Sequence, residues 1–532
     1  MEAIGFAISI ASAVELSVNP KVAETDFRYR YGSALVKICG AFKYAEEEIR
    51  EKALAVDSAW YRTQTQLNLL EKIEGKLEDN FKEMQRRSLH VLDGKLMKAV
   101  AKLSSLEKAQ SKTGLHRVTY ARTKNTFDEI IRELKEWQDQ FDPSWYLMLK
   151  ITDITIDSGL ASHAKQEPFL DDAREIRHAL QGAATSLKGL FMEKSSIPAS
   201  QVEPVPFSSA RWFREAGTGR CFVVDSIRCQ MNPNPHATER DVRSLAGRLR
   251  CVDILRFGLL QCKGVVRHTI DKRPASYDIV LRSPLEISSD PRGLRTYLIS
   301  GDRCSLTTRL SLAQQLARSV CYVHNLGLVH KSVRPEAIIG FADTLASLDS
   351  VYLAGFDRFR DEGGHSNYHQ DDDWEKNVYR HPSRQGSTPE AYFEMRHDIY
   401  SLGVCLLEIG LWSSFAVPEA GSGTMTLGAP LADCAGFILH RRETQPQPQP
   451  QLSPREQLKG HLVSLARTDL SFHMGDRYRD VVVNCLTCLD SDNLDFNDFN
   501  DIADAEGIFI GAQYIEKVGG QFSRILLVSY FR

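Results

Sequence analysis

The sequence predicts a multidomain protein in which an all-helical N-terminal part precedes a part with both helices and strands. Apolar residues recur at steps of three and four from Thr25 to about Ser111, which is typical of helices. A Pro- and Ser-rich stretch follows at Ser195–Ser209, and short strand-like runs appear only after it. The 532 residues are enough for two or three domains with sizeable cores, so the expected fold class is α followed by α+β.

The N-terminal part has the pattern of long amphipathic helices. One apolar stripe runs from Leu67 to Met84, and another runs from Val91 to Leu106. Thr113–Trp137 predicts a further helix, which we expect Asp142-Pro143 to break. Four or five long helices with short connections predict an up-down helical bundle over residues 1–150.

The first residues are apolar enough to suggest a conditional contact with a membrane. Ala3–Val18 is 16 residues long and contains Glu15, which is short for a stable transmembrane helix. Glu2 stands where a signal peptide carries basic residues, so we expect a cytoplasmic protein that is recruited to a membrane at most conditionally. The alternative is that the segment is the first core helix of a soluble bundle. The residues expected to meet lipid are Ile4, Phe6, Ile8, Ile10 and Val14.

The composition is ordinary for a globular protein and excludes some classes. Hydrophobic residues make up 42% and charged residues 25%, and the net charge of −3 argues against a globally basic nucleic-acid binder. The eleven cysteines are scattered, which favours reduced thiols. Cys485 and Cys488 form a CxxC without a second pair or histidines at ligand spacing, so no metal site is expected there.

A connecting region is expected over residues 151–209. It would hold one more helix, Asp171–Glu193, and then the linker Ser195–Ser209, whose prolines and serines disfavour regular structure. Short strands and one helix are expected after the linker. These are the strands Cys221–Val224, Leu255–Cys262 and Tyr277–Leu281, and the helix Arg240–Cys251.

A helix-like run, Arg309–Asn325, leads into the ten residues His330-Lys-Ser-Val-Arg-Pro-Glu-Ala-Ile-Ile339. This segment resembles the catalytic segment of protein kinases, H-R-D-L-x-x-x-N. His330 keeps the histidine and Pro335 matches, while Arg334 takes the place of the usual lysine. Ser332 falls where the catalytic Asp belongs, and Ala337 falls where the metal-binding Asn belongs.

A second run, Asp398–Glu408, is similar to the helix that kinases bury in the large lobe. The resemblance implies that Asp398 hydrogen-bonds the backbone of the catalytic loop. It also implies a two-lobed kinase-like domain over residues 210–532, with the small lobe at about 210–300 and the large lobe at about 301–532.

The remaining kinase positions lack their chemical groups. Tyr352–Asp357 aligns with the magnesium motif on Phe356, so Gly355 replaces the metal-binding Asp, and a shifted Asp357 is a weaker candidate for a cation ligand. No lysine occurs from Ser195 to Gln261, where the phosphate-contacting lysine is expected. Gly217 and Gly219 are either a remnant of the nucleotide loop or an ordinary turn. The resemblance therefore predicts a pseudokinase with no cofactor, although residual ATP binding stays a lesser alternative.

A helical bundle followed by a kinase-like domain resembles fungal proteins with an N-terminal HeLo-type domain. Its architecture is also similar to that of the mixed-lineage kinase domain-like pseudokinases of regulated cell death. The resemblance implies a membrane-active or incompatibility-type effector bundle that self-associates, contacts lipids on activation and is controlled by the pseudokinase and an upstream signalling protein. Two alternatives stay open, a signalling scaffold whose bundle binds only proteins and a weakly active protein kinase.

Overall fold

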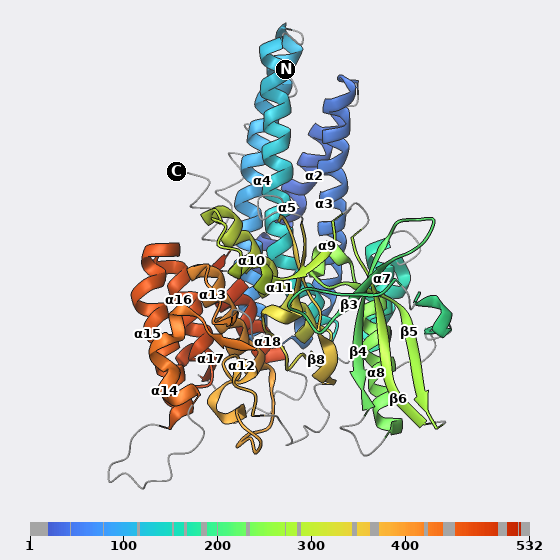
Figure 1. The fold of residues 1–532 in the computed structure, drawn as a ribbon. Coiled ribbons are helices and arrows are strands. Elements are labelled where there is room, and N and C mark those ends of the chain that lie inside the picture. The colour runs from blue at the N-terminus through green and yellow to red at the C-terminus, as the bar shows by residue number, and fades with distance from the viewer. Residues whose placement is uncertain are drawn as a thin grey trace. The chain divides into compact units, whose positions relative to one another are not determined.

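The computed structural model describes residues 20–42, 44–77, 79–113, 117–151, 154–163, 168–181, 189–198, 201–229, 235–271, 273–284, 289–342, 348–361, 372–419, 424–439, 453–497, 508–519 and 521–522. The chain divides into two compact units, Met1–Asp142 and Pro143–Arg532. Helices come first, and a part with both helices and strands follows (Figure 1). This order confirms the coarser part of the expected fold class.

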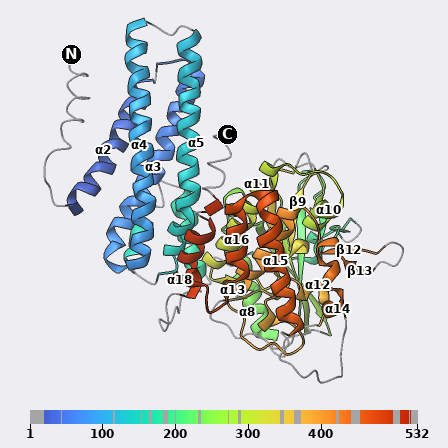
Figure 2. The same cartoon turned by 90° about the vertical axis from the view of Figure 1, so that its left-hand side faces the viewer.

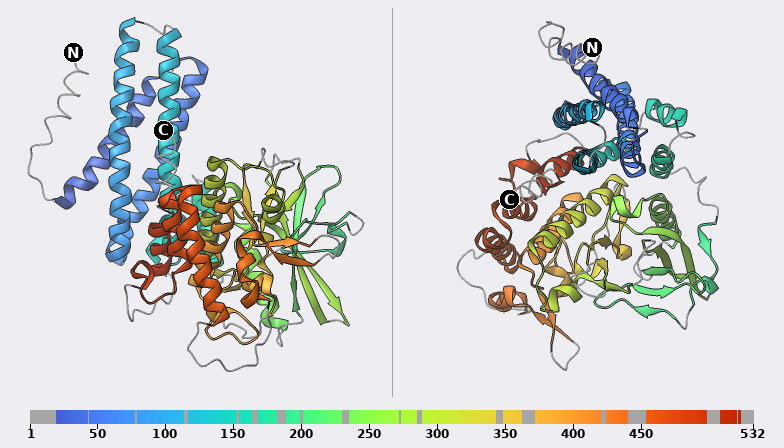
Figure 3. Two further views of the ribbon diagram at one scale, coloured as in Figure 1. Left: turned by 60° about the vertical axis from the view of Figure 1, so that its left-hand side comes forward. Right: turned by 90° about the horizontal axis from the view of Figure 1, so that it is seen from above.

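The described residues of the first unit form long helices that alternate in direction. They are α2 (Pro20–Ala41), α3 (Glu47–Ile73), α4 (Asp79–Thr113) and the larger part of α5 (Arg117–Met148). The ion pairs Lys102–Glu129 and Lys95–Glu136 join α4 to α5 in antiparallel order (Figures 2 and 3). Contacts of Glu48 with Lys124, and of Arg62 with Asp142, join α3 to α5 in parallel order.

Most of the two apolar stripes predicted from the sequence is buried inside this unit, but Val91, which begins the second stripe, is 49% exposed. Trp60 lies against Gly32, where an added Cβ would come within 1.8 Å of the indole ring. Trp137 stacks on Phe141 with ring centroids 4.7 Å apart, and its indole N–H donates to the Ser88 carbonyl at 2.9 Å. Close approach of α2 to α3 therefore depends on a residue without a side chain.

The expected helix break at Asp142-Pro143 is wrong, because α5 continues through Pro143 to Met148. A proline inside a helix loses one backbone hydrogen bond and crowds the preceding turn. Here Trp145 is buried, as are the three residues that follow it, and burial of four large side chains offsets that cost. Tertiary packing thus overrides the local signal.

The second unit contains a six-stranded sheet in the order β1-β5-β6-β4-β3-β2, with α8 packed against β5 and β6. Its strands are β1 (Phe191–Met192), β2 (Glu203–Pro204), β3 (Arg211–Arg214), β4 (Cys221–Arg228), β5 (Gln261–Ile270) and β6 (Arg273–Arg282). Helix α8 spans Pro235–Arg250, and α9 spans Ile254–Phe257. The expected strand Leu255–Cys262 thus begins with a helical turn, because the Asp253 carboxylate caps the amides of Leu255 and Arg256.

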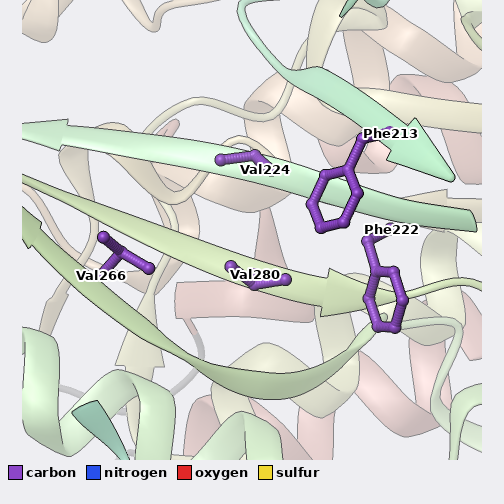
Figure 4. Packing of buried hydrophobic residues seen from close by; sticks show 5 residues of the cluster. All are labelled: Phe213, Phe222, Val224, Val266 and Val280. Atoms are coloured by element: carbon purple, nitrogen blue, oxygen red, sulfur yellow. The ribbon is translucent and has the colours of Figure 1, made fainter. Parts of the chain in front are cut away.

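The stretch expected to be a linker instead covers one face of this sheet. Five side chains form an apolar cluster on that face: Phe213, Phe222, Val224, Val266 and Val280 (Figure 4). Met192, Ile197 and Val202 pack against the cluster. We call Leu190–Val205 the strap, because it begins with β1 at one edge of the sheet and ends with β2 at the other edge. The apolar residues among the prolines decide this outcome, because they bury surface on the sheet.

The predicted helix before the sheet also has different bounds in the structure. The expected helix Asp171–Glu193 is shorter, since α7 spans Pro168–Leu180 and Phe191 and Met192 belong to β1. Phe191 lies beside Tyr277 and under Arg243, so contacts with the sheet and α8 select the strand.

The rest of the second unit is mainly helical and lies beside the sheet (Figures 1 and 3). Its helices are α6 (Ile154–His163), α10 (Leu294–Ile299), α11 (Leu306–Asn325), α12 (Trp374–Asn377), α13 (Met395–Leu411), α14 (Ala435–Ile438), α15 (Pro454–Met474), α16 (Asp476–Leu486), α17 (Leu494–Asn497) and α18 (Ile508–Tyr514). Short strands accompany them: β7 (Pro291–Gly293), β8 (Leu328–Val329), β9 (Ile338–Phe341), β10 (Val351–Leu353), β11 (Arg360–Asp361), β12 (Ala416–Pro418) and β13 (Met425–Leu427). Helix α13 is buried along its length and contacts α11, α15 and α16.

Candidate functional site

The segment His330–Ile339 is held in place by Asp398 on the first turn of α13. The buried carboxylate accepts hydrogen bonds from the backbone N–H of His330 at 2.7 Å and of Lys331 at 2.8 Å. The His324 ring lies 3.2 Å from the same carboxylate. Burial raises the pKa of Asp398, but the hydrogen bond and electrostatic attraction of His324, together with the Lys331 amide, outweigh it and keep the pKa below its usual value. An ionised carboxylate therefore organises this loop.

Two neighbouring amides can point at one carboxylate only if the backbone turns sharply between them. Lys331 adopts this turn, with a φ of 68° that is unfavourable for a residue with a side chain. Strain of this kind costs about 1–3 kcal/mol and persists only where the surrounding contacts compensate for it. The Asp398 hydrogen bonds are such contacts.

His330 is buried and acts as a neutral connector. Its Nδ1 accepts from the backbone N–H of Ser332 at 3.2 Å, which leaves the proton on Nε2 to donate to the Ala354 carbonyl at 2.8 Å. The ring also lies 4.7 Å from the ring of Phe356. Burial lowers the pKa of His330, so the neutral form is favoured. His330 thus connects the loop to the Gly355–Phe356 segment.

Arg334 and Pro335 begin a short turn that is tied to α10. Glu336 in this turn forms an ion pair of 2.6 Å with Arg295, which is fully buried. The Arg295 guanidinium also donates to the Tyr379 hydroxyl at 3.1 Å, and Tyr379 in turn contacts both Glu408 oxygens at 3.0 Å. Burial raises the pKa of Glu408 to about 7. Charged groups buried in this way are stable only when they are paired, so the network fixes the loop firmly.

The positions compared with the two metal ligands are in contact with each other. Gly355 has a φ of 75°, and a Cβ added there would lie 2.8 Å from the Cβ of Ala337. The Ala354 N–H donates to the Ala337 carbonyl at 2.7 Å, which holds the two backbones together. A side chain at Gly355 would therefore meet both an unfavourable backbone conformation and a rigid neighbour. Ser332, which aligns with the catalytic Asp of kinases, is also buried and carries a hydroxyl in place of a carboxylate.

Asp225 belongs to this site, although the sequence pattern did not single it out. It lies on β4, is 3% exposed and accepts hydrogen bonds from the backbone N–H of Gly355 at 2.7 Å and of Phe356 at 3.3 Å. Burial raises the pKa of Asp225 to about 6, partly opposed by these two amides, and the nearby Asp357 carboxylate raises it further. The sequence feature that could have drawn attention to Asp225 is its position as a single carboxylate within the apolar run that begins at Cys221.

The two glycines Gly217 and Gly219 lie in the turn between β3 and β4. Both have positive φ, 91° and 67°, and an added Cβ at either position would meet nothing within 4 Å. The turn is closed by the Thr218 hydroxyl and the Glu215 carboxylate, 2.9 Å apart. The tight turn alone is enough to explain glycine at both positions.

The residues expected to meet lipid, Ile4 to Val14, lie outside the described residues. Among the helices that the structure does describe, none is both long and apolar enough to cross a bilayer. No group of three or more His, Cys, Asp or Glu side chains in the described ranges has an arrangement that could hold a metal ion. Cys485 and Cys488 are both buried, with raised thiol pKa values caused mainly by burial.

No protein family matches the sequence, and no curated protein matches it either.

Proposed function

We propose that the unit Pro143–Arg532 is a protein-kinase-like regulatory module without catalytic activity. We further propose that it controls the N-terminal helical bundle, which acts as a membrane-active effector of the cell-death or incompatibility type. The bundle would associate with further copies of itself and contact lipids once an upstream signal releases it.

The proposal that the second unit lacks catalytic activity rests on the contact between Gly355 and Ala337. In protein kinases, the residues at these places are the Asp and Asn that hold magnesium. Here the two positions pack directly on each other, while Asp398 still accepts the amides of the loop. Features that shape a kinase loop are thus retained at the same place where the chemical groups are missing.

The position of Asp225 supports the same conclusion. In kinases, the strand before the helix of the small lobe carries the lysine that contacts the phosphates. Strand β4 precedes α8, and its carboxylate at Asp225 binds the amides of Gly355 and Phe356. Ionised Asp225 and nearby Asp357 would repel a nucleotide polyphosphate, whereas a lysine attracts it.

Loss of all these groups is incompatible with phosphoryl transfer. Kinase catalysis depends on magnesium and on positioned charges that stabilise the transferred phosphoryl group. A serine at position 332 has no charge with which to orient a nucleophile. We therefore assign the unit a binding and regulatory role.

The second half rests on the amphipathic helices and on the apolar segment Ala3–Val18. A short apolar helix binds a membrane weakly by itself, and self-association multiplies that weak affinity. The described helices α3, α4 and α5 supply a stable body on which such a segment could be presented.

Nucleotide binding tests the first half. A ligand that binds the folded state raises the melting temperature. Because we expect no nucleotide binding, 1 mM Mg-ATP should leave the melting temperature of the full chain unchanged. We also expect no phosphate incorporation during incubation with labelled Mg-ATP. Incorporation that is lost in Asp357→Ala would show an active kinase and contradict the proposal.

Leakage of dye from liposomes tests the second half. We expect the fragment 1–142, joined to an inducible dimeriser, to release dye from anionic vesicles, whereas the full chain does not. Ile8→Asp should abolish release, and Leu54→Asp, which changes an exposed side chain of α3, should not. A folded, dimerised fragment that releases no dye would favour the protein-binding scaffold instead.

A further inference from the structure

Helix α5 crosses the division between the two units, and the residues on either side of that division have separate anchors. The Asp142 carboxylate accepts from the Arg62 guanidinium at 2.9 and 3.0 Å and from the Gln66 amide at 3.0 Å. Both partners belong to α3 in the first unit. Asp142 itself is only 1% exposed, so this paired charge fixes its position firmly.

The next residue is anchored in the second unit. The Pro143 carbonyl accepts from the Asn325 side-chain amide, at the end of α11, at 2.9 Å. Tyr146 meets the rings of Phe257 and Tyr322 edge-on, with centroids 4.9 and 5.7 Å away. Phe257 and Tyr322 stack on each other at 4.1 Å with planes only 6° apart. We call Phe257, Tyr322 and Asn325 the seat of α5.

The end of α5 is also held by a buried arginine. Arg177 on α7 is 1% exposed, and its guanidinium donates to the carbonyls of Leu149 at 2.9 Å and Ile151 at 2.7 Å. The same guanidinium pairs with the Asp157 carboxylate. Leu149 and Ile151 follow the last residue of α5, so Arg177 fixes the turn by which the chain leaves the helix.

The seat is connected directly to the candidate site. Asn325 follows His324, whose ring contacts the loop-organising carboxylate of Asp398. Phe257 precedes Gly258, whose carbonyl accepts from the Leu353 backbone N–H at 3.0 Å, two residues before Gly355. A change at the candidate site therefore has two short routes to the seat.

We propose that the seat couples the two units, so that the conformation of the Pro143–Arg532 unit sets the stability of the helices in Met1–Asp142. Asp142 and Pro143 are consecutive, and Cα atoms of consecutive residues are about 3.8 Å apart. Because α5 is one helix across this point, we expect strain in its last turns to reach the contacts of Asp142 with Arg62 and Gln66. This proposal rests on the proposed regulatory role of the second unit.

Hydrogen exchange of the full chain tests this coupling. Phe257→Leu removes the stack with Tyr322 at the seat, and Phe213→Leu removes a matched stack with Phe222 on the sheet, at 5.4 Å. We expect Phe257→Leu to accelerate amide exchange at least about tenfold in Ser144–Leu149 and also in α3, near Arg62 and Gln66. Phe213→Leu should accelerate exchange in the sheet and leave α3 unchanged.

Two results would overturn the proposal. The first is an unchanged rate of amide exchange in α3 of Phe257→Leu, whether or not exchange becomes faster in Ser144–Leu149. The second is an equal acceleration of exchange in α3 by Phe257→Leu and Phe213→Leu. If Phe257→Leu does not fold, Asn325→Ala, which removes only the hydrogen bond to Pro143, is measured by the same criteria. The readout is exchange rather than dye release, so a bundle that never permeabilises liposomes would refute the proposed function and leave the coupling intact.

Discussion

Gly355 and Asp225 meet in the candidate site. Gly355 occupies a left-handed conformation against Ala337, and Asp225 places a carboxylate on the amides of Gly355 and Phe356. Under the proposed kinase-like arrangement, Gly355 stands at the position of a metal-binding Asp, and Asp225 places negative charge where kinases have a lysine. An aspartate introduced at position 355 would therefore meet both steric and electrostatic opposition.

Introducing a carboxylate at position 355 should destabilise the protein without creating a metal site. Gly355→Asp adds a Cβ 2.8 Å from that of Ala337 at a φ of 75°, and we expect a loss of about 2–4 kcal/mol in the free energy of unfolding. Urea denaturation of the full chain measures this loss. Gly217→Asp is the control, because its φ of 91° is also positive but its Cβ would meet no atom within 4 Å. Equal losses in the two variants would show that contact with Ala337 is unimportant.

Asp225→Asn should change how stability depends on pH. The folded pKa of Asp225 is raised from 3.8 to about 6, so its contribution to stability is complete below about pH 4 and is lost as the pH rises to about 6. Two pH units correspond to on the order of 3 kcal/mol. An asparagine does not titrate, so the stability of the variant relative to the wild type should rise by that amount between pH 4 and pH 7. Unfolding curves at both pH values test this, and a constant difference would contradict it.

At the scale of secondary-structure elements, the strap is the least expected feature of the second unit. Its two short strands lie at opposite edges of the sheet, and Met192, Ile197 and Val202 cover the apolar cluster. Gly264 on β5 allows the strap to approach, since an added Cβ would lie 2.3 Å from the Met192 sulfur and 2.9 Å from the Leu190 carbonyl oxygen. The strap and the sheet therefore form one packed layer.

Gly264→Ala should displace the first part of the strap. The added methyl group crowds backbone as well as a flexible side chain, and overpacking of this kind costs about 1–3 kcal/mol. We expect faster protease cleavage and faster amide exchange at Leu190–Ile197. Gly436→Ala on α14, where nothing lies within 4 Å, is the matched control and should leave the strap unchanged. An unaltered strap in Gly264→Ala would show that it tolerates displacement from β5.

At the scale of the whole molecule, α5 is the element shared by the two units. Its residues up to Asp142 belong to the first unit, and its last turns belong to the second. The helix continues across Pro143 because each side has its own strong anchors, as the contacts of Asp142 and Tyr146 show. Stability of one unit is therefore expected to depend on the other through a single covalent element.

An insertion of four glycines between Asp142 and Pro143 should uncouple the units. Each anchor would survive, so both units should keep their secondary structure by circular dichroism. The urea midpoint of unfolding of each unit is followed by hydrogen exchange. We expect the midpoints of the two units to lie on the order of 0.5 M further apart than in the wild type, because about 1 kcal/mol of coupling is lost. Midpoints that do not move would argue that the helix transmits no stability across this point.

The sequence by itself determined the order of helices followed by a part with helices and strands, because hydrophobic periodicity is a local property. It also predicted the pairing of Asp398 with the loop backbone, through a resemblance of motifs. The role of Asp225 could not be read in this way, since its partners Gly355 and Phe356 lie far along the chain. Only the tertiary structure decided that Pro143 does not end α5 and that Ser195–Ser209 covers a sheet. In both cases, burial of apolar side chains by distant elements outweighs the local preference of proline.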